Sequence, residues 1–312
     1  MKQRLPLLAL LLGAATLAAS GLFSLRAVAA PDTRRPVLPL PSRPAPDQAR
    51  IAVGERLFAD PRLSLHGRIS CWSCHDVSTN GASARPFDRG DDGTAMPLNT
   101  PTVFNSTLNF RFTWTGHITS APGMIAASLR NPHVMGGDGP GIERLRRDPV
   151  LAAQVRAAYH RELDEPAVID ALTLYLRSLT TPGARFDQWL AGNRRALTAQ
   201  ERRGWARFQS VGCVSCHQGV NIGGNLFQRH GIFHPLASPN PAVLRVPSLR
   251  NVATTAPYFH DGSAPDLSTA ILSMARAQLD ITLSPGDVAD ITAFLGTLTG
   301  SYKGRPVRAP RR

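Results

Sequence analysis

The stretch Cys71–His75 reads Cys-Trp-Ser-Cys-His, and Cys213–His217 repeats the pattern as Cys-Val-Ser-Cys-His. Two thiols two residues apart, followed directly by a histidine, form the attachment pattern of a c-type haem. The thiols bond covalently to the haem, and the histidine becomes the proximal iron ligand. The alternatives are chance, or a redox dithiol that precedes a histidine. We predict two covalent haems, held by Cys71, Cys74 and His75 in one site and by Cys213, Cys216 and His217 in the other.

These two runs contain all four cysteines, so the prediction leaves none for a disulfide, a zinc site or a thiol nucleophile. The 312 residues are enough for two domains of ordinary size, and 43% apolar residues are enough for packed cores. A net charge of +13 predicts a basic surface that attracts acidic partners. The basic residues are scattered and the densest run, 305–312, is short, so we do not expect nucleic acid as a partner.

The N-terminal region has the pattern of an export signal. Lys2 and Arg4 precede an uncharged run over residues 5–25, and Ala-Val-Ala at 27–29 offers a small-x-small cleavage site. We therefore predict a signal peptide over residues 1–30. The uncharged run is also long enough to span a bilayer, so an uncleaved anchor is the alternative. Both interpretations place the body of the protein outside the cytoplasm, and we expect the periplasm.

Composition divides the rest of the chain. Residues 31–46 are rich in proline and arginine, and we expect an extended linker that contributes to no core. We predict a first haem domain over 47–184 and a second over 185–302. The remaining residues, 303–312, read as a basic, solvated tail.

The two halves resemble each other beyond the cysteines. Gly-Glu-Arg-Leu-Phe at 54–58 corresponds to Gly-Trp-Ala-Arg-Phe at 204–208, and residues 175–180 correspond to 294–299. Each half reads as helix, haem motif, loops and closing helix, and no run of alternating strands is evident. The sequence therefore predicts a mainly α protein with two cytochrome c-like domains in tandem. Caps and periodicity predict helices over 47–58, 124–129, 141–159, 166–179, 198–208, 270–279 and 284–298.

Four longer motifs carry a resemblance to a known family. They are Leu-Phe-Ala-Asp-Pro-Arg-Leu-Ser at 57–64, Asn-Thr-Pro-Thr-Val-Phe-Asn at 99–105, Val-Pro-Ser-Leu-Arg-Asn-Val at 246–252 and Ala-Pro-Tyr-Phe-His-Asp-Gly at 256–262. Over about residues 50–300 the chain resembles the bacterial di-haem cytochrome c peroxidases, whose relatives include the MauG-like enzymes.

The resemblance implies a division of labour between the haems. The N-terminal haem would reduce hydrogen peroxide to water, and the C-terminal haem would pass on electrons from a small periplasmic donor. That donor would be a cytochrome c or a cupredoxin, and the basic surface favours an acidic or dipolar one. The resemblance also leaves a homodimer open.

The resemblance assigns further site residues. Spacing alone leaves Met274 equally a helix core residue or an iron ligand. The resemblance makes it the axial ligand of the C-terminal haem, where MauG-like members have tyrosine, so Met274 favours the peroxidases. Trp114 takes the place of the tryptophan that helps electrons cross between the haems. An oxygen-only calcium site between the domains would use Asn99 and the backbone carbonyls of Thr255 and Pro257.

The chain also departs from the family. The acid that assists cleavage of peroxide is replaced by Val134, and no histidine lies at 91–96, where many members have one that caps the peroxidatic iron. Acid–base help is worth roughly 10²–10⁴ in rate. Trp114 is followed by Thr-Gly-His at 115–117, where the family has Asp-Gly-Arg. The segment 224–246 is also shorter than is usual in the family.

His133 has three possible roles beside Val134. The three are a surface loop residue, a proton shuttle that replaces the missing acid, and a ligand that closes the first iron. Met96 and Met135 are further candidates for that ligand. The missing acid keeps a second function open, a di-haem electron carrier or sensor without turnover. A third, a MauG-like oxidase of a protein substrate, is disfavoured by Met274.

The haem motifs predict two covalent haems per chain. Replacing Cys71 and Cys74 together by alanine should remove one haem and leave the other, because each haem has its own pair of thiols. Intact mass and a haem assay on the purified exported protein measure this. A wild-type protein with one haem, or with a metal on these thiols, would contradict the prediction.

Overall fold

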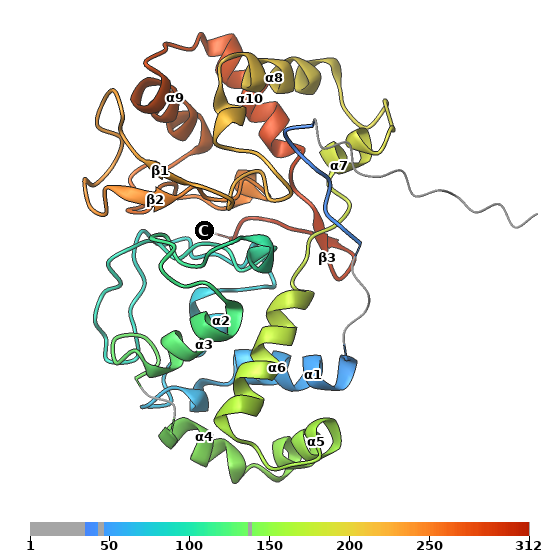
Figure 1. The fold of residues 1–312 in the computed structure, drawn as a ribbon, viewed down its shortest axis with the longest axis vertical. Coiled ribbons are helices and arrows are strands. Elements are labelled where there is room, and N and C mark those ends of the chain that lie inside the picture. The colour runs from blue at the N-terminus through green and yellow to red at the C-terminus, as the bar shows by residue number, and fades with distance from the viewer. Residues whose placement is uncertain (1–34, 43–46, 137–138, 312) are drawn as a thin grey trace, which may run out of the picture. The chain divides into compact units, whose positions relative to one another are not determined.

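Helices make up most of the regular structure in both halves of the chain (Figure 1). The computed structural model describes residues 35–42, 47–136 and 139–311, which belong to the unit Arg34–Arg312, while the predicted signal peptide lies outside the described residues. In the first half the helices are α1 (Gln48–Ala59), α2 (Cys71–Cys74), α3 (Ala121–Arg130), α4 (Gly139–Arg146), α5 (Pro149–Tyr159) and α6 (Glu165–Ser178). In the second they are α7 (Arg185–Leu190), α8 (Ala199–Ser210), α9 (Leu267–Leu279) and α10 (Pro285–Gly296).

Strands are few and short in the described residues. β1 (Phe227–Arg229) pairs antiparallel with β2 (Val243–Arg245), and β3 (Ser301–Tyr302) pairs antiparallel with β4 (Arg305–Pro306). Short 3-10 turns lie at Pro61–Leu63, Ser106–Leu108, Cys213–Ser215 and Val252–Thr254. The prediction of a mainly α fold is therefore confirmed. Within the described ranges, no helix has the length and apolarity needed to cross a membrane.

Side-chain caps start the helices where the sequence predicts them. The Asp47 carboxylate accepts hydrogen bonds from the first backbone N–H groups of α1. The Thr198 hydroxyl accepts from the Glu201 N–H while the Glu201 carboxylate accepts from the Thr198 N–H, so a capping box opens α8. Ser284 and Asp287 form the same arrangement at α10.

One predicted helix is wrong in its extent. The sequence predicts one helix over 141–159, but α4 ends at Arg146 and α5 begins at Pro149. Between them, the Asp148 carboxylate accepts from the N–H groups of Val150 and Leu151 and caps a new helix with proline in its first turn. The short helix α7 was not predicted, because its six residues are too few to show a periodic pattern.

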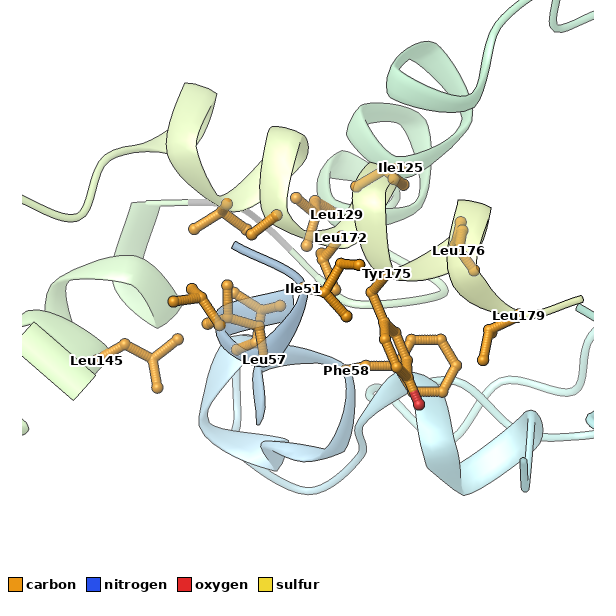
Figure 2. Close-up of a cluster of buried hydrophobic side chains, with 14 of the residues drawn as sticks. Ile51, Leu57, Phe58, Ile125, Leu129, Leu145, Leu172, Tyr175, Leu176 and Leu179 are labelled. Carbon is orange, nitrogen blue, oxygen red and sulfur yellow. The ribbon is translucent and has the colours of Figure 1, made fainter. Parts of the chain in front are cut away.

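Two hydrophobic clusters form the core, one in each half. The first contains Phe58 of α1 and Tyr175 of α6, whose rings lie 5.2 Å apart (Figure 2). The second contains Phe208 of α8 and Phe294 of α10, whose rings lie 5.3 Å apart. In each half the helix before the haem motif thus packs against the closing helix, so the two halves share this packing as well as the order of their motifs.

Two glycines let these helices approach closely. A Cβ atom on Gly54 would lie 2.1 Å from the Ala171 carbonyl oxygen, and one on Gly204 would lie 1.9 Å from the Asp290 carbonyl oxygen. The obstacle is backbone in both places, so it cannot move aside as a flexible side chain would. Gly54 and Gly204 hold matching positions of the repeat, so both halves use the same close crossing.

The terminal segments correct two expectations. Val37 is 1% exposed and packs in the second cluster, although residues 31–46 were expected to join no core. Its segment forms a parallel bridge to Gly219. Val307 is 5% exposed and packs in the first cluster, although 303–312 was expected to be a solvated tail. Each terminal segment therefore packs against the half of the chain distant from it in sequence, which composition alone does not reveal.

Gly54→Ala should destabilise the fold by about 1–3 kcal/mol, because its methyl group forces α1 away from α6. Chemical denaturation of the haem-loaded protein measures this. Gly296→Ala is the control, because a Cβ there meets no atom within 4 Å. Equal loss of stability in the two variants would show that the close crossing is not what requires glycine at position 54.

Candidate functional site

The first cysteine pair lies on the single turn α2. Ser70 caps this turn, and its N–H donates to the Ser73 hydroxyl at 3.0 Å. The His75 N–H donates to the Cys71 carbonyl at 2.9 Å, so the histidine follows directly from the turn that carries both thiols. A tight turn of this kind brings two side chains three residues apart to the same side, as covalent attachment to one flat group requires.

The imidazole of His75 is held in one orientation. Its Nδ1 lies 3.1 Å from the Gly81 carbonyl oxygen, so Nδ1 is the donor and Nε2 is left free as the metal-binding atom. Burial lowers the pKa of His75, which keeps the ring neutral near pH 7, as metal binding requires. A backbone acceptor that fixes the tautomer is the usual partner of a metal-bound histidine.

The cysteine environments argue against redox thiols. Burial raises the pKa of Cys71 and of Cys74 to about 12, and that of Cys213 to about 11. A reactive dithiol needs a lowered pKa, because the thiolate is the nucleophile. These three thiols stay protonated at neutral pH, which disfavours the dithiol alternative.

The second motif lies on the 3-10 turn Cys213–Ser215, and its histidine is more buried than His75. The His217 N–H donates to the Cys213 carbonyl at 3.0 Å. Burial lowers the pKa of His217 to about 4, although the nearby backbone of Ile222 and Pro247 acts in the opposite direction. In the described part of the chain, no acceptor reaches its Nδ1 with hydrogen-bond geometry. The ring is thus neutral and available as a ligand.

A cavity of about 250 Å³ opens beside the second motif. Most of its lining is apolar, and Met274 of α9 lies on the same cavity as His217. The sequence-predicted residues that line it are Cys213, Cys216, His217, Met274, Trp114, Asn99, Thr255 and Pro257. The structure therefore brings together residues that lie up to 175 positions apart, from Asn99 to Met274.

A buried cation on this cavity tests whether a haem fits. Arg245 is 5% exposed, and burial lowers its pKa to about 10. Its guanidinium donates to the carbonyls of Thr113 and Val246, and no carboxylate among the described residues pairs with it. A buried charge needs a partner. The carboxylates of a haem would supply one, so an apolar cavity with thiols, histidine and a free cation fits this group.

Trp114 joins the first half of the chain to this cavity. Its indole N–H donates to the Asn99 carbonyl at 2.7 Å, and its own carbonyl accepts from the Arg245 N–H at 2.8 Å. The Asn99 side-chain N–H groups donate to the carbonyls of Arg85 and Pro86, so Oδ1 is the side-chain atom left for the predicted cation. No cluster of three or more His, Cys, Asp or Glu side chains suited to a metal occurs among the described residues.

His133 lies at the surface. Its side chain is 62% exposed, and its Nδ1 lies 2.9 Å from the Asp92 carboxylate. The backbones of the two loops also meet, since the Asp91 N–H donates to the Val134 carbonyl at 2.9 Å. This position matches the surface loop residue among the three roles considered. Val134 packs against the first core cluster, and Met135 lies within it.

Two residues near these sites were not found by sequence reasoning. Asp88 is 3% exposed, hydrogen-bonds the Ser83 hydroxyl at 2.9 Å, and its charge raises the pKa of Cys74. One of its carboxylate oxygens has no partner among the described residues. Arg245 is the second residue that sequence reasoning did not find. A single Asp in a loop and a single Arg in a strand carry no sequence signal of burial, so only the fold identifies them.

Comparison with known proteins identifies relatives over most of the chain. The family model for di-haem cytochrome c peroxidase matches residues 48–195. Cytochrome c551 peroxidase of Nitrosomonas europaea is 36% identical over 82% of this chain and 81% of its own length. Cytochrome c peroxidase Ccp of Escherichia coli is 35% identical over 88% of this chain, but the match spans only 63% of that longer relative.

More distant relatives share the fold. Methylamine utilization protein MauG of Methylorubrum extorquens is 29% identical over 80% of this chain and 78% of its own length. The structure of a MauG-like protein associated with microbial copper homeostasis superposes with a TM-score of 0.74 at 26% identity, covering 84% of this chain and 93% of that one. The diheme peroxidase BthA from Burkholderia thailandensis has a TM-score of 0.68 at 21% identity, covering 86% and 91%.

Arg245→Met should lower the reduction potential of the group in the second cavity. A nearby positive charge favours the reduced state, and a unit charge acting through an effective dielectric of about 20 gives a shift on the order of tens of millivolts. Spectroscopic redox titration measures this. Arg276→Met, an exposed change on α9, is the control and should leave the potential unchanged. An unchanged potential in Arg245→Met would mean that the buried cation lies too far from the redox group.

Proposed function

Because this chain belongs to the di-haem cytochrome c peroxidase family, we propose that it reduces hydrogen peroxide to water with electrons from a small redox protein. The observation that carries the proposal is the second cavity, where His217, Met274 and the buried Arg245, which has no carboxylate partner among the described residues, meet beside Trp114. Each peroxide takes up two electrons and two protons and gives two waters. The export pattern of residues 1–30 supports the periplasm as its location.

We assign one covalent haem to each motif, and the bound haems supply iron that exchanges electrons one at a time. Cys71, Cys74 and His75 would hold the first haem. Cys213, Cys216, His217 and Met274 would hold the second, and a thioether ligand suits electron transfer because it raises the potential. Arg245 would compensate the carboxylate charge of the second haem.

Trp114 is the proposed electron bridge between the two sites. Its indole is fixed by the Asn99 carbonyl, so the ring keeps one orientation against the second cavity. The resemblance also assigns a calcium ion to Asn99, Thr255 and Pro257, and the free Oδ1 of Asn99 supports this. A calcium ion there would stabilise the segment that carries the tryptophan, since both lie on the same stretch of chain.

The electron donor would bind beside the second cavity. Ile232, Phe233 and Leu272 are exposed apolar side chains on this side. Gln278 connects this patch to the cavity, because it lines the cavity and its side-chain oxygen accepts a hydrogen bond from the Ile232 N–H. Exposed Arg276 lies on α9 with Leu272, and exposed Arg229 is tied to Gln278, whose side-chain N–H donates to the Arg229 carbonyl. An apolar patch flanked by cations fits an acidic donor, a small cytochrome c or cupredoxin.

A second function remains a candidate because of Val134. The first site lacks the family's acid there, and His133 is bound to Asp92 at the surface. A di-haem electron carrier or sensor on the same fold needs no proton donor at this position. Peroxide turnover separates the two functions, because a carrier consumes none.

Replacing Met274 by histidine should lower the potential of one haem, because loss of the thioether favours the ferric state. The near-infrared sulfur-to-iron charge-transfer band should disappear in the same variant. Met124→Leu is the control, because Met124 packs against the first core cluster. Persistence of both the potential and the band in Met274→His would assign the ligand to another methionine.

Val134→Glu should raise peroxide turnover, by up to the roughly 10²–10⁴ typical of acid–base catalysis, because it restores a carboxyl group. Stopped-flow oxidation of a reduced donor, with the protein in the half-reduced state, measures this. His133→Ala should leave turnover and the haem spectrum unchanged, since His133 lies at the surface. Absence of turnover in both wild type and Val134→Glu would favour the carrier or sensor.

A further inference from the structure

A histidine that the sequence did not single out, His230, lines the second cavity directly after β1. Side chains alternate along a strand, so Gln228 and His230 point to the same side, and both line the cavity. Phe227 and Arg229 take the alternate positions and are exposed. The Gln228 side-chain N–H donates to the Cys216 sulfur at 3.9 Å. This side of the strand therefore lies against a thiol that would bind the second haem.

A backbone contact fixes which ring nitrogen of His230 carries the proton. Its Nε2 lies 2.9 Å from the Pro241 carbonyl oxygen, which can only accept, so the neutral ring donates from Nε2 and keeps a lone pair on Nδ1. Nδ1 is buried, and within the described residues it has no hydrogen-bond partner. Burying an acceptor without a partner is costly. Since His230 lines the cavity, this nitrogen is available to a proton when a bound group favours one.

The neighbours of His230 carry different charges. The ring of His260 packs on it with centroids 4.9 Å apart, and burial lowers the pKa of His260, so this neighbour is neutral at pH 7. Next along the chain, the Asp261 carboxylate accepts two backbone hydrogen bonds and supplies a negative charge. Arg245 lines the same cavity as a cation, while Arg229 is exposed.

The other titratable side chains on this cavity do not exchange protons near neutral pH. Three of them would be occupied by haem attachment and iron binding, namely Cys213, Cys216 and His217. Burial raises the pKa of Tyr258 to about 12 and lowers that of Arg245 only to about 10, so neither changes charge near pH 7. An imidazole does change charge in this range. Among the described residues on this cavity, His230 thus has both a titratable ring and a free nitrogen.

We propose that His230 binds a proton when the second haem takes up an electron, so that electron entry at this site is coupled to proton uptake. Each reduction adds one electron to the haem iron and one proton from solvent to Nδ1, and oxidation releases both. Reduction removes one positive charge from the cavity, which favours an imidazolium there. The ring is partly exposed, so a proton can reach it. The coupling rests on the haem assigned to the second motif under the proposed function, and not on peroxide turnover.

Redox titration of the haem-loaded protein at several pH values tests the coupling. In wild type the potential of the haem with the thioether ligand should fall as pH rises, by up to about 59 mV per pH unit, which is the limit for one proton per electron. His230→Gln should lose most of this slope, because glutamine keeps a donor for the Pro241 carbonyl but binds no proton. His234→Gln is the matched control, since His234 lies on the same segment and pairs with Asp280 at the surface, and should keep the slope.

Proton uptake during half-reduction is an independent readout. In unbuffered solution with an indicator dye, wild type should take up protons as the second haem is reduced, and His230→Gln should take up fewer. No uptake and no slope in wild type would overturn the coupling alone, as would a slope that persists in His230→Gln and disappears in His260→Gln. A haem assay that finds no haem on the second motif would overturn the haem assignment, and the coupling with it. A protein that shows the slope but consumes no peroxide would keep the coupling and lose the peroxidase function.

Discussion

One buried hydrogen-bond junction joins the two halves of this protein. The Thr181 hydroxyl accepts from the side-chain N–H groups of Asn105, at 2.7 Å, and Asn251, at 3.1 Å. Both asparagines adopt a left-handed backbone, with φ of 58° and 62°, a conformation that asparagine tolerates better than most residues. Because all three residues are buried, the loss of any of these hydrogen bonds would leave a polar group with neither a protein partner nor water. The junction therefore requires both halves to be folded.

The two asparagines of this junction make the same pair of hydrogen bonds, each within its own half of the chain. The Asn105 N–H donates to the Leu179 carbonyl while its Oδ1 accepts from the Thr181 N–H. Asn251 does the same with the Leu298 carbonyl and the Gly300 N–H. Each asparagine thus ties a loop that follows a haem motif to the end of its own closing helix. The stretch 99–114, which carries Asn99 and Trp114, is held against the second cavity in consequence.

Two buried arginines differ in whether an acidic side chain within the described residues compensates their charge. Arg250 is 2% exposed, and its guanidinium forms two hydrogen bonds with the Asp187 carboxylate, at 2.9 and 3.1 Å, so its charge is satisfied within the fold. Arg245 is buried to a similar degree, and its guanidinium has only carbonyl partners within the part of the chain that the structure describes. A buried cation without an acid is costly unless a bound anion compensates it. The contrast explains why we connect Arg245, and not Arg250, with a bound group.

The sequence by itself determined what depends on local spacing. The two Cys-x-x-Cys-His runs, the capping residues Asp47, Thr198 and Ser284, and the matching glycines all act over a few residues, so their patterns are readable in order. The family motifs added Met274 and Trp114, which spacing alone left open. The tertiary structure decided what depends on distant neighbours: the burial of Arg245 and Asp88, the surface position of His133, and the core positions of Val37 and Val307. Burial and pairing arise only when remote segments meet, and no local pattern encodes which segments those are.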